Sequence, residues 1–288
     1  MRRPIPLLAS LLALAACGRM DQEGMLLVLD DRYSAETLLT EKDGIASPDG
    51  LRWESGRLFI ADEGGSALRV LEPGGKLVTL ATGEQGLKSP EDMTRGPDGA
   101  LWFTDDDAGG VWRFAKALDR AVAAEGRLAT SEGLAFTPSG TLLVGGAGAV
   151  VAVKPGEGPQ KLRLPIGKPE SFAFDGAGNL YIADNEADIL YLVTRDGRLH
   201  RPIQSREGFS PESLHMGASG LLITDSRHGK LHRFTAEDGL STVAVFAGAL
   251  SNVQGITSDE AGNLYVSVQS DLKNRRGSII RLTPRKPR

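Results

Sequence analysis

A strand–turn–strand phrase repeats six times along this 288-residue chain and constrains its fold more than any other feature. In the clearest copy, residues 169–174 and 180–184 are strand-like runs that enclose the turn sequence Asp-Gly-Ala-Gly-Asn. The second run of the copies ends at Asp62, Asp105, Gly145, Asp184, Asp225 and Ser267, which gives intervals of 43, 40, 39, 41 and 42 residues. A repeat of about 40–45 residues with four short strands is typical of a β-propeller blade. We therefore predict an all-β, six-bladed β-propeller.

The closure of the ring is predicted from the two ends of the repeat region. The last unit ends on the strand-like run 278–282, whereas an unassigned strand-like run, 35–40, precedes the first unit. The early run resembles the outermost strands of other units, at 77–80 and 243–246. We expect it to pair with the last strand of the sixth blade, which closes the ring and covers two sheet edges.

One polar residue recurs at the start of the first strand of each unit. In a propeller this strand is innermost, so the six side chains are expected to meet at one mouth of the axial channel. They are Asp49, Glu91, Glu132, Glu170, Glu212 and Gln254.

Five carboxylic acids in one small ring cannot all stay ionised without compensation. Either some pKa values rise or a cation lies among them. Oxygen donors without Cys or His favour Ca²⁺, with Mg²⁺ or Mn²⁺ as alternatives, over Zn²⁺. A purely structural alternative is that each acid caps the turn that enters its own blade or pairs with an Arg.

The ring phrases resemble those of the senescence marker protein/gluconolactonase/luciferin-regenerating enzyme family. The resemblance lies in short segments such as 48–51, 131–136 and 169–172 and extends over the propeller, roughly residues 45–284. It implies one divalent metal, calcium or zinc, at the axial mouth and hydrolysis of lactones. Counting blades in parallel, the family's first-blade Glu corresponds to Asp49, its two Asn to Glu132 and Glu170, and its Asp to Glu212.

Two functional hypotheses follow for this chain. The first is a metal-dependent hydrolase that acts on a lactone or small ester, with Glu212 or His228 as the catalytic base. The second is a non-catalytic propeller, similar to NHL-repeat proteins, that binds a protein partner or a ligand on its acidic face. A propeller in which the metal is only structural is a third hypothesis.

Several polar residues outside the ring receive structural interpretations. The Asp residues that close the second strand, at 62, 105, 184 and 225, are expected to accept hydrogen bonds from backbone N–H groups. His215 is expected in the channel or core, and His200 and His232 at the surface. The spacing of His228 and His232 is not expected to align them, because the segment reads as loop and strand.

The N-terminal residues predict export and a lipid anchor. Arg2 and Arg3 precede a short apolar run that ends at Cys17, the single cysteine of the chain. We expect residues 1–17 to be a lipoprotein signal with a lipidated Cys17, followed by a tether at 18–33, the propeller at 34–284 and a basic tail at 285–288. This places the protein in a bacterial envelope, facing the periplasm, on the outer rather than the inner membrane.

Composition and charge restrict the partners. The net charge of −4 gives no basic footprint for a nucleic acid. We expect a monomer that binds a small substrate or a protein partner and that contacts the membrane only through its lipid.

Overall fold

The computed structural model describes residues 24–122, 128, 130–146, 148–204, 208–269 and 277–286. The predicted signal segment, Cys17, the first part of the tether and the last two residues of the basic tail lie outside this range. Within it, no helix has the length and apolar character needed to cross a membrane.

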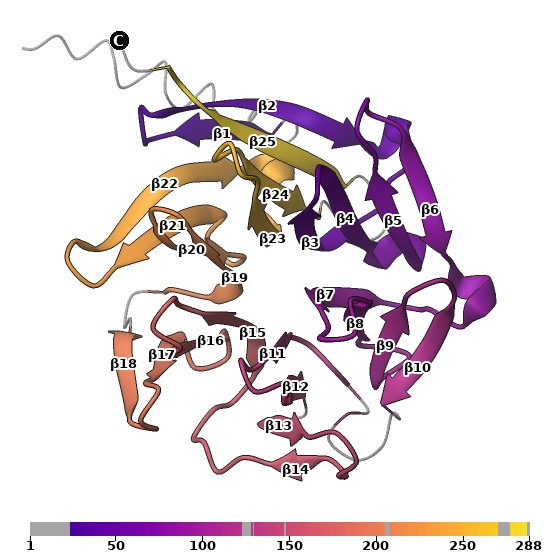
Figure 1. Ribbon diagram of the computed structural model, residues 1–288. Coiled ribbons are helices and arrows are strands. Elements are labelled where there is room, and N and C mark those ends of the chain that lie inside the picture. Colours follow the sequence, from indigo (N-terminus) through magenta and orange to yellow (C-terminus); the bar gives the residue numbers. More distant parts are fainter. Residues whose placement is uncertain are drawn as a thin grey trace, which may run out of the picture.

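Six antiparallel sheets surround a common axis and confirm the predicted six-bladed propeller (Figure 1). Blade one consists of β3 (Pro48–Glu54), β4 (Arg57–Asp62), β5 (Ala67–Leu71) and β6 (Leu77–Ala81). Blade two consists of β7 (Pro90–Arg95), β8 (Leu101–Asp105), β9 (Val111–Phe114) and β10 (Leu118–Val122). Blade three consists of β11 (Leu134–Phe136), β12 (Leu142–Gly146), β13 (Ala149–Val153) and β14 (Gln160–Lys161). Blade four consists of β15 (Pro169–Phe174), β16 (Leu180–Asp184), β17 (Ile189–Val193) and β18 (Leu199–Gln204). Blade five contains β19 (Pro211–Gly217), β20 (Gly220–Asp225), β21 (Lys230–Thr235) and β22 (Gly239–Ala247). Blade six contains β23 (Val253–Ser258), β24 (Leu264–Val268) and β25 (Ser278–Pro284). Short 3-10 turns join some of them: η1 (Glu41–Asp43), η2 (Glu63–Gly65), η3 (Gly83–Gln85) and η5 (Gly248–Leu250).

The sixth blade takes its outer strand from the front of the chain. Strand β2 (Tyr33–Thr40) pairs antiparallel with β25, from Tyr33 opposite Pro284 to Thr40 opposite Ser278. The predicted ring closure is therefore confirmed. The backbone hydrogen bonds between β2 and β25 thus join the two ends of the propeller within one blade.

One strand lies where the sequence analysis placed only a tether. Strand β1 (Met25–Val28) pairs with the outer strand β22 and gives the fifth blade a fifth strand. The salt bridge between Asp30 and Arg233, 2.9 Å long and mostly buried, ties the following residues to the same blade. The chain before β2 is thus part of the folded body from residue 25 onward.

The tight turns inside the blades follow from their Asp, Gly and Asn residues. In blade four, Asp175 Oδ1 accepts hydrogen bonds from the N–H groups of Ala177 and Asn179, at 2.9 and 2.8 Å. Gly178 has a φ of +83°, a left-handed conformation that a side chain disfavours. The same bonds recur around Asp259 in blade six.

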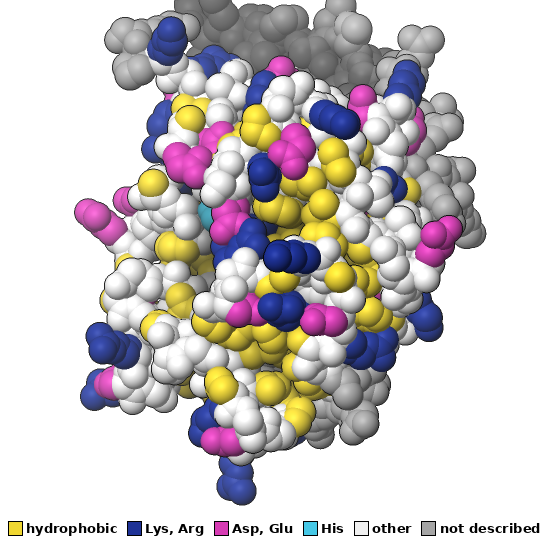
Figure 2. All heavy atoms as spheres, turned by 45° about the vertical axis from the view of Figure 1, so that its right-hand side comes forward, with side chains coloured by type: hydrophobic (Ala, Val, Ile, Leu, Met, Phe, Trp, Pro, Cys, Tyr) yellow, Lys and Arg dark blue, Asp and Glu magenta, His cyan; other side chains and the backbone are white. Residues whose placement is uncertain are grey.

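The core consists of apolar side chains packed between neighbouring blades. The second strand of each blade is covered on both faces, and one of its residues is fully buried in every case: Ile60, Phe103, Val144, Ile182, Ile223 and Val266. This explains why these strands are nearly continuous apolar runs. On the face shown in Figure 2, acidic and basic side chains are interspersed around exposed hydrophobic ones.

The Asp that ends the second strand of four blades accepts hydrogen bonds from backbone N–H groups, as predicted. Asp62 Oδ1 accepts the N–H groups of Ala46 and Ser47, both at 2.9 Å, and this Asp is fully buried. Asp105, Asp184 and Asp225 accept equivalent backbone hydrogen bonds. Each therefore holds the loop that leads into the first strand of its own blade, where the ring residue lies.

Candidate functional site

Five of the six predicted ring residues line one small cavity at the axial mouth. We call them the acidic ring: Asp49, Glu91, Glu132, Glu170 and Glu212. The cavity between them measures about 20 Å³, which is room for about one water molecule or ion. Gln254 is buried outside this lining, and its Nε2 donates to Asn252 Oδ1 at 2.8 Å.

Glycine after the ring residue lets neighbouring inner strands approach closely. A Cβ at Gly50 would meet the Glu91 carbonyl, and one at Gly133 would meet the Glu170 carbonyl. In both cases the distance from the Cβ to the carbonyl oxygen would be well below 3.0 Å, which is shorter than real Cβ contacts in proteins. The small radius of the ring therefore depends on these glycines.

Hydroxyl groups from the second strands hold the backbone of three ring positions. Thr104 donates to the carbonyl of Glu132, Thr224 to that of Gln254 and Ser267 to that of Asp49. In each case the donor belongs to the preceding blade, so the hydrogen bond joins two blades at the axis.

The most compact carboxylate cluster joins two ring residues to a loop residue. Asp49, Glu63 and Glu91 each offer an oxygen, and the three oxygens lie within 4.8 Å of one another. Gln269 Nε2 donates to Asp49 Oδ2 at 3.0 Å and also to Glu63. Ser89 Oγ donates to the other Glu63 oxygen at 3.0 Å. The sequence analysis did not assign Glu63, which lies in the loop after β4.

A lysine compensates two other acids of the ring. Lys168 Nζ lies 2.6 Å from Glu170 Oε1 and 3.4 Å from Glu132 Oε1. Its backbone N–H donates to Asp184 at 3.0 Å, which fixes the loop before β15. The structural alternative proposed pairing with an Arg. In the described structure the ion-pair partner is a Lys instead of an Arg, and it pairs with two of the ring positions, Glu132 and Glu170.

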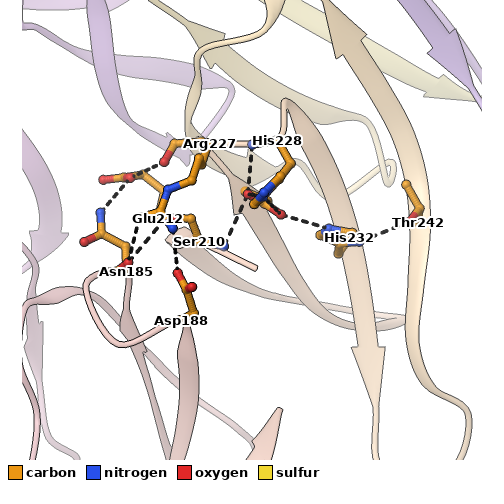
Figure 3. Close-up of polar contacts among 10 residues, drawn as sticks. Asn185, Asp188, Ser210, Glu212, Arg227, His228, His232 and Thr242 are labelled. Carbon is orange, nitrogen blue, oxygen red and sulfur yellow. Dashed lines mark hydrogen bonds and ion pairs between the residues drawn. The ribbon is translucent and has the colours of Figure 1, made fainter. Parts of the chain in front are cut away.

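Glu212 is held by polar side chains of two neighbouring loops (Figure 3). Its Oε2 accepts hydrogen bonds from Ser226 Oγ at 2.7 Å and from Asn185 Nδ2 at 3.1 Å. Burial raises the pKa of Glu212, and these two hydrogen bonds oppose the rise. The carboxyl group is therefore held in one orientation at the edge of the cavity.

Asp49, Glu91 and Glu170 of the ring also have raised pKa values. Burial, followed by the charges of Glu212 and Glu63, raises the pKa of Asp49 well above its usual range. Burial and the charges of Asp49 and Glu63 do the same for Glu91. Burial together with the Glu212 and Glu132 charges raises the pKa of Glu170 to about 9, although Lys168 opposes the shift. Without a further cation, the ring holds protons at neutral pH.

His228 and His232 share one buried carboxylate. His228 Nδ1 lies 2.8 Å from Asp225 Oδ1, and His232 Nε2 lies 3.6 Å from Asp225 Oδ2 (Figure 3). Burial raises the pKa of Asp225, but the hydrogen bonds from both histidines outweigh it and lower that pKa. His232 is 6% exposed, so its predicted surface position is wrong. The expectation that the pair would not align is also wrong, because a tight loop and the start of β21 aim both rings at Asp225.

The donor set fits a hard divalent cation. The Asp49–Glu63–Glu91 cluster supplies only oxygen atoms, which Ca²⁺, Mg²⁺ and Mn²⁺ prefer. Burial, and after it the repulsion between neighbouring acids, raises the pKa values of Asp49 and Glu91, and a cation would relieve that repulsion. Lys168 binds the acids of blades three and four, and within the described part of the chain no cationic side chain forms an ion pair with this cluster.

Comparison with known proteins finds similarity in structure only. No protein-family model matches the sequence, and no curated protein sequence matches it. A gluconolactonase from Xanthomonas campestris superimposes with a TM-score of 0.69 at 16% identity, over 88% of this chain and 90% of that one. A luciferin-regenerating enzyme gives 0.69 at 12% identity, over 87% and 95%. An auxiliary nutrient binding protein from Bacteroides thetaiotaomicron gives 0.68 at 12% identity, over 92% and 77%.

These similarities confirm the fold implied by the sequence resemblance. At this level of identity they carry no information about activity, and the three matched proteins have different functions. Any function must therefore be argued from the side chains at the axial mouth.

Proposed function

We propose that this protein is a metal-dependent hydrolase that opens a lactone or small ester at the axial mouth of its propeller. The observation that carries the proposal is the cluster of Asp49, Glu63 and Glu91 oxygens within 4.8 Å of one another. A cluster of partly buried carboxylates with raised pKa values is typical of a functional site rather than of a packed core.

The proposed roles divide the acidic ring into three parts. Asp49, Glu63 and Glu91 would hold the cation, with Ca²⁺ as first choice and Mn²⁺ or Zn²⁺ as alternatives. When bound, the cation would supply Lewis-acid polarisation of the ester carbonyl. The substrate would lie above the ring, because the cavity inside it is only about 20 Å³.

Glu212 is the proposed base that takes a proton from the attacking water. It lines the cavity, and Ser226 and Asn185 hold its carboxylate in one orientation. A raised pKa suits this task, since a base works best when its pKa lies near the working pH. His228, the other predicted base, lies outside the cavity lining and is engaged with Asp225.

Lys168 is the proposed group that stabilises the negative charge developing on the substrate as water attacks the ester carbonyl. Its ammonium lies at the ring, and its side chain is 46% exposed, so a substrate above the mouth can reach it. Its charge also lowers the pKa of Glu212 and thereby limits how far burial raises that pKa.

The test is a metal assay followed by activity. Elemental analysis of the dialysed soluble domain should give one divalent ion per chain, and Glu91→Gln should lose it. A lactone panel should then show turnover that Lys168→Met and Glu212→Gln reduce by at least tenfold. Glu157→Gln removes an exposed acid on the outer side and serves as the control. Absence of metal in the wild type, or of any effect on melting by added Ca²⁺ or Mn²⁺, contradicts the proposal.

The ion-sized cavity also favours a second candidate, a non-catalytic propeller whose metal is structural and whose acidic face binds a ligand or a protein. This candidate requires a stoichiometric metal with no turnover on any lactone or ester.

The cellular location remains part of the proposal. Lipidation of Cys17 would leave seven residues between the anchor and β1, so the propeller would lie close to a bacterial membrane, on the periplasmic side and, by our proposal, at the outer membrane. Labelling with a radioactive fatty acid, absent in Cys17→Ala, tests the anchor, and membrane fractionation tests its location.

A further inference from the structure

A second cavity lies in the axial channel below the acidic ring. It measures about 270 Å³, and the residues after the ring positions on the inner strands form its walls. Asp92 and Ser213 line both cavities and therefore separate them. We call the second cavity the lower chamber. Its size approaches that of small-ligand sites, roughly 300 Å³ and above.

Arg52 is the positive group of the lower chamber. Its Nε is buried and has no hydrogen-bond partner. No carboxylate of the described residues lies within salt-bridge distance of its guanidinium, and burial lowers its pKa. Native proteins rarely leave a buried charged donor without a partner, so such a group points to a missing ligand or bound water.

The neighbouring polar groups among the described residues form no ion pair with Arg52, although the charge of Asp92 acts on it from a distance. The side-chain oxygens of Asp92, which lies between the two cavities, accept hydrogen bonds from the backbone N–H groups of Met93 at 2.8 Å and Leu134 at 3.4 Å. His215 Nε2 bonds to Ser258 Oγ at 2.7 Å, and burial and the Arg52 charge lower the pKa of His215 to about 4. The histidine is therefore neutral at pH 7 and adds no charge.

The remaining lining mixes apolar and polar side chains. The large apolar ones are Trp53, Phe172, Phe174, Leu214 and Met216, from three different blades, and Thr94, Ser213 and Thr257 add hydroxyl groups. A concave site that combines apolar walls with a few convergent polar groups is the usual form of a small-molecule site.

We propose that the lower chamber binds a small organic carboxylate, with its carboxylate on the Arg52 guanidinium and its apolar body against the aromatic and aliphatic walls. A planar guanidinium matches the two oxygens of a carboxylate. Among the described residues that line the chamber, Arg52 is the one cation, so a monoanion matches the site better than a dianion such as phosphate. The ligand enters from the mouth opposite the acidic ring, since the five acids repel it at the other. This site is separate from the proposed hydrolytic centre.

The probe is benzoate, with benzamide as its neutral match, in EDTA so that no metal contributes. Trp53 reports binding, because its ring lines the chamber and its indole N–H donates to Glu260 at 2.7 Å. We expect the Trp53 indole resonance to shift saturably in ¹H–¹⁵N spectra, while those of Trp102 and Trp112 stay in place. Benzamide should bind at least tenfold more weakly.

Two variants test the assignment. Arg52→Gln should weaken benzoate binding at least tenfold, and Met216→Trp, which fills the chamber but keeps Arg52, should do the same. Arg57→Gln, which loses only a half-exposed pair with Glu72, should bind as the wild type does. An unmoved Trp53 resonance in the wild type overturns the proposal. So does equal affinity in a folded Arg52→Gln or Met216→Trp, or equal competition by inorganic phosphate.

Discussion

The raised pKa values of the acidic ring predict that the metal-free protein loses stability as the pH rises from 7.0 to 8.5. Glu170 has the clearest value: its pKa rises from 4.5 to about 9, first because of burial and then because of Glu212 and Glu132. The side chain is only 4% exposed, so solvent screens this shift little. Between those two pKa values the folded state holds a proton that the unfolded state has released. The stabilisation is complete below pH 4.5 and is lost as the pH rises toward 9.

The size of the effect follows from one proton held only by the folded state. Each pH unit costs about 1.36 kcal/mol, so 1.5 units cost about 2 kcal/mol. For a domain of this size that corresponds to a fall in Tm of about 4–8 °C. The window begins at pH 7.0 because His215, whose pKa is lowered to about 4, contributes the opposite slope only up to its unfolded value of 6.5.

The assay is thermal unfolding by circular dichroism in EDTA at several pH values, repeated with excess Ca²⁺. Glu170→Gln should flatten the slope in EDTA, because the amide does not titrate, and Ca²⁺ should flatten it in the wild type by replacing protons. Glu157→Gln, an exposed acid paired with Lys154, should keep the wild-type slope. Stability that is constant or increases between pH 7.0 and 8.5 in EDTA would refute the reasoning.

Three further predictions concern the framework of the site. Gly133→Ala should lower the free energy of unfolding by about 1–3 kcal/mol, because the new Cβ would meet a ring carbonyl. Gly176→Ala is the control: the space around Gly176 is open, so this variant should change the free energy of unfolding by less than about 0.5 kcal/mol. Urea titration measures both. Asp184→Ala should cost about 2–5 kcal/mol in the same titration, because a buried acceptor of several N–H groups is lost. Deletion through residue 40 should abolish the cooperative thermal transition, because the last blade then loses its outer strand, and a truncated chain that melts like the full one would contradict the role of β2 in closure.

The fold and the ring were predictable because their signals are local and repeated. Turn residues and apolar runs recur at a nearly constant interval, and the ring residue holds the same place in every copy. Symmetry alone then brings those side chains to one axis. Gln254 is the exception, since its amide finds a partner in Asn252 instead of the cavity.

The missed residues come from loops, where no repeat predicts position. Glu63 reaches the ring from the turn after β4, and Lys168 from the loop before β15. Both had a signal in hindsight. Glu63 follows one of the repeated strand-closing acids, and Lys168 lies one residue before the proline that precedes Glu170. The predicted surface position of His232 did not take into account the strand that covers it. Strand β1 is an apolar run, Met25–Val28, that lies outside the six repeats and was included in the tether.

The position of Lys168 explains how this chain tolerates more acid than its sequence resemblance implies. Where that family has two Asn, this protein has Glu132 and Glu170, and each lies within 3.4 Å of the same ammonium. One lysine therefore compensates part of the added charge within blades three and four. The charge that it does not reach belongs to Asp49, Glu63 and Glu91, whose oxygens are also the closest together. A Lys168→Met variant should thus raise the affinity of the ring for Ca²⁺, measured by calorimetry, because two more carboxylates would then need a cation. Weaker Ca²⁺ binding in that variant would show that the lysine organises the site instead of competing with the metal.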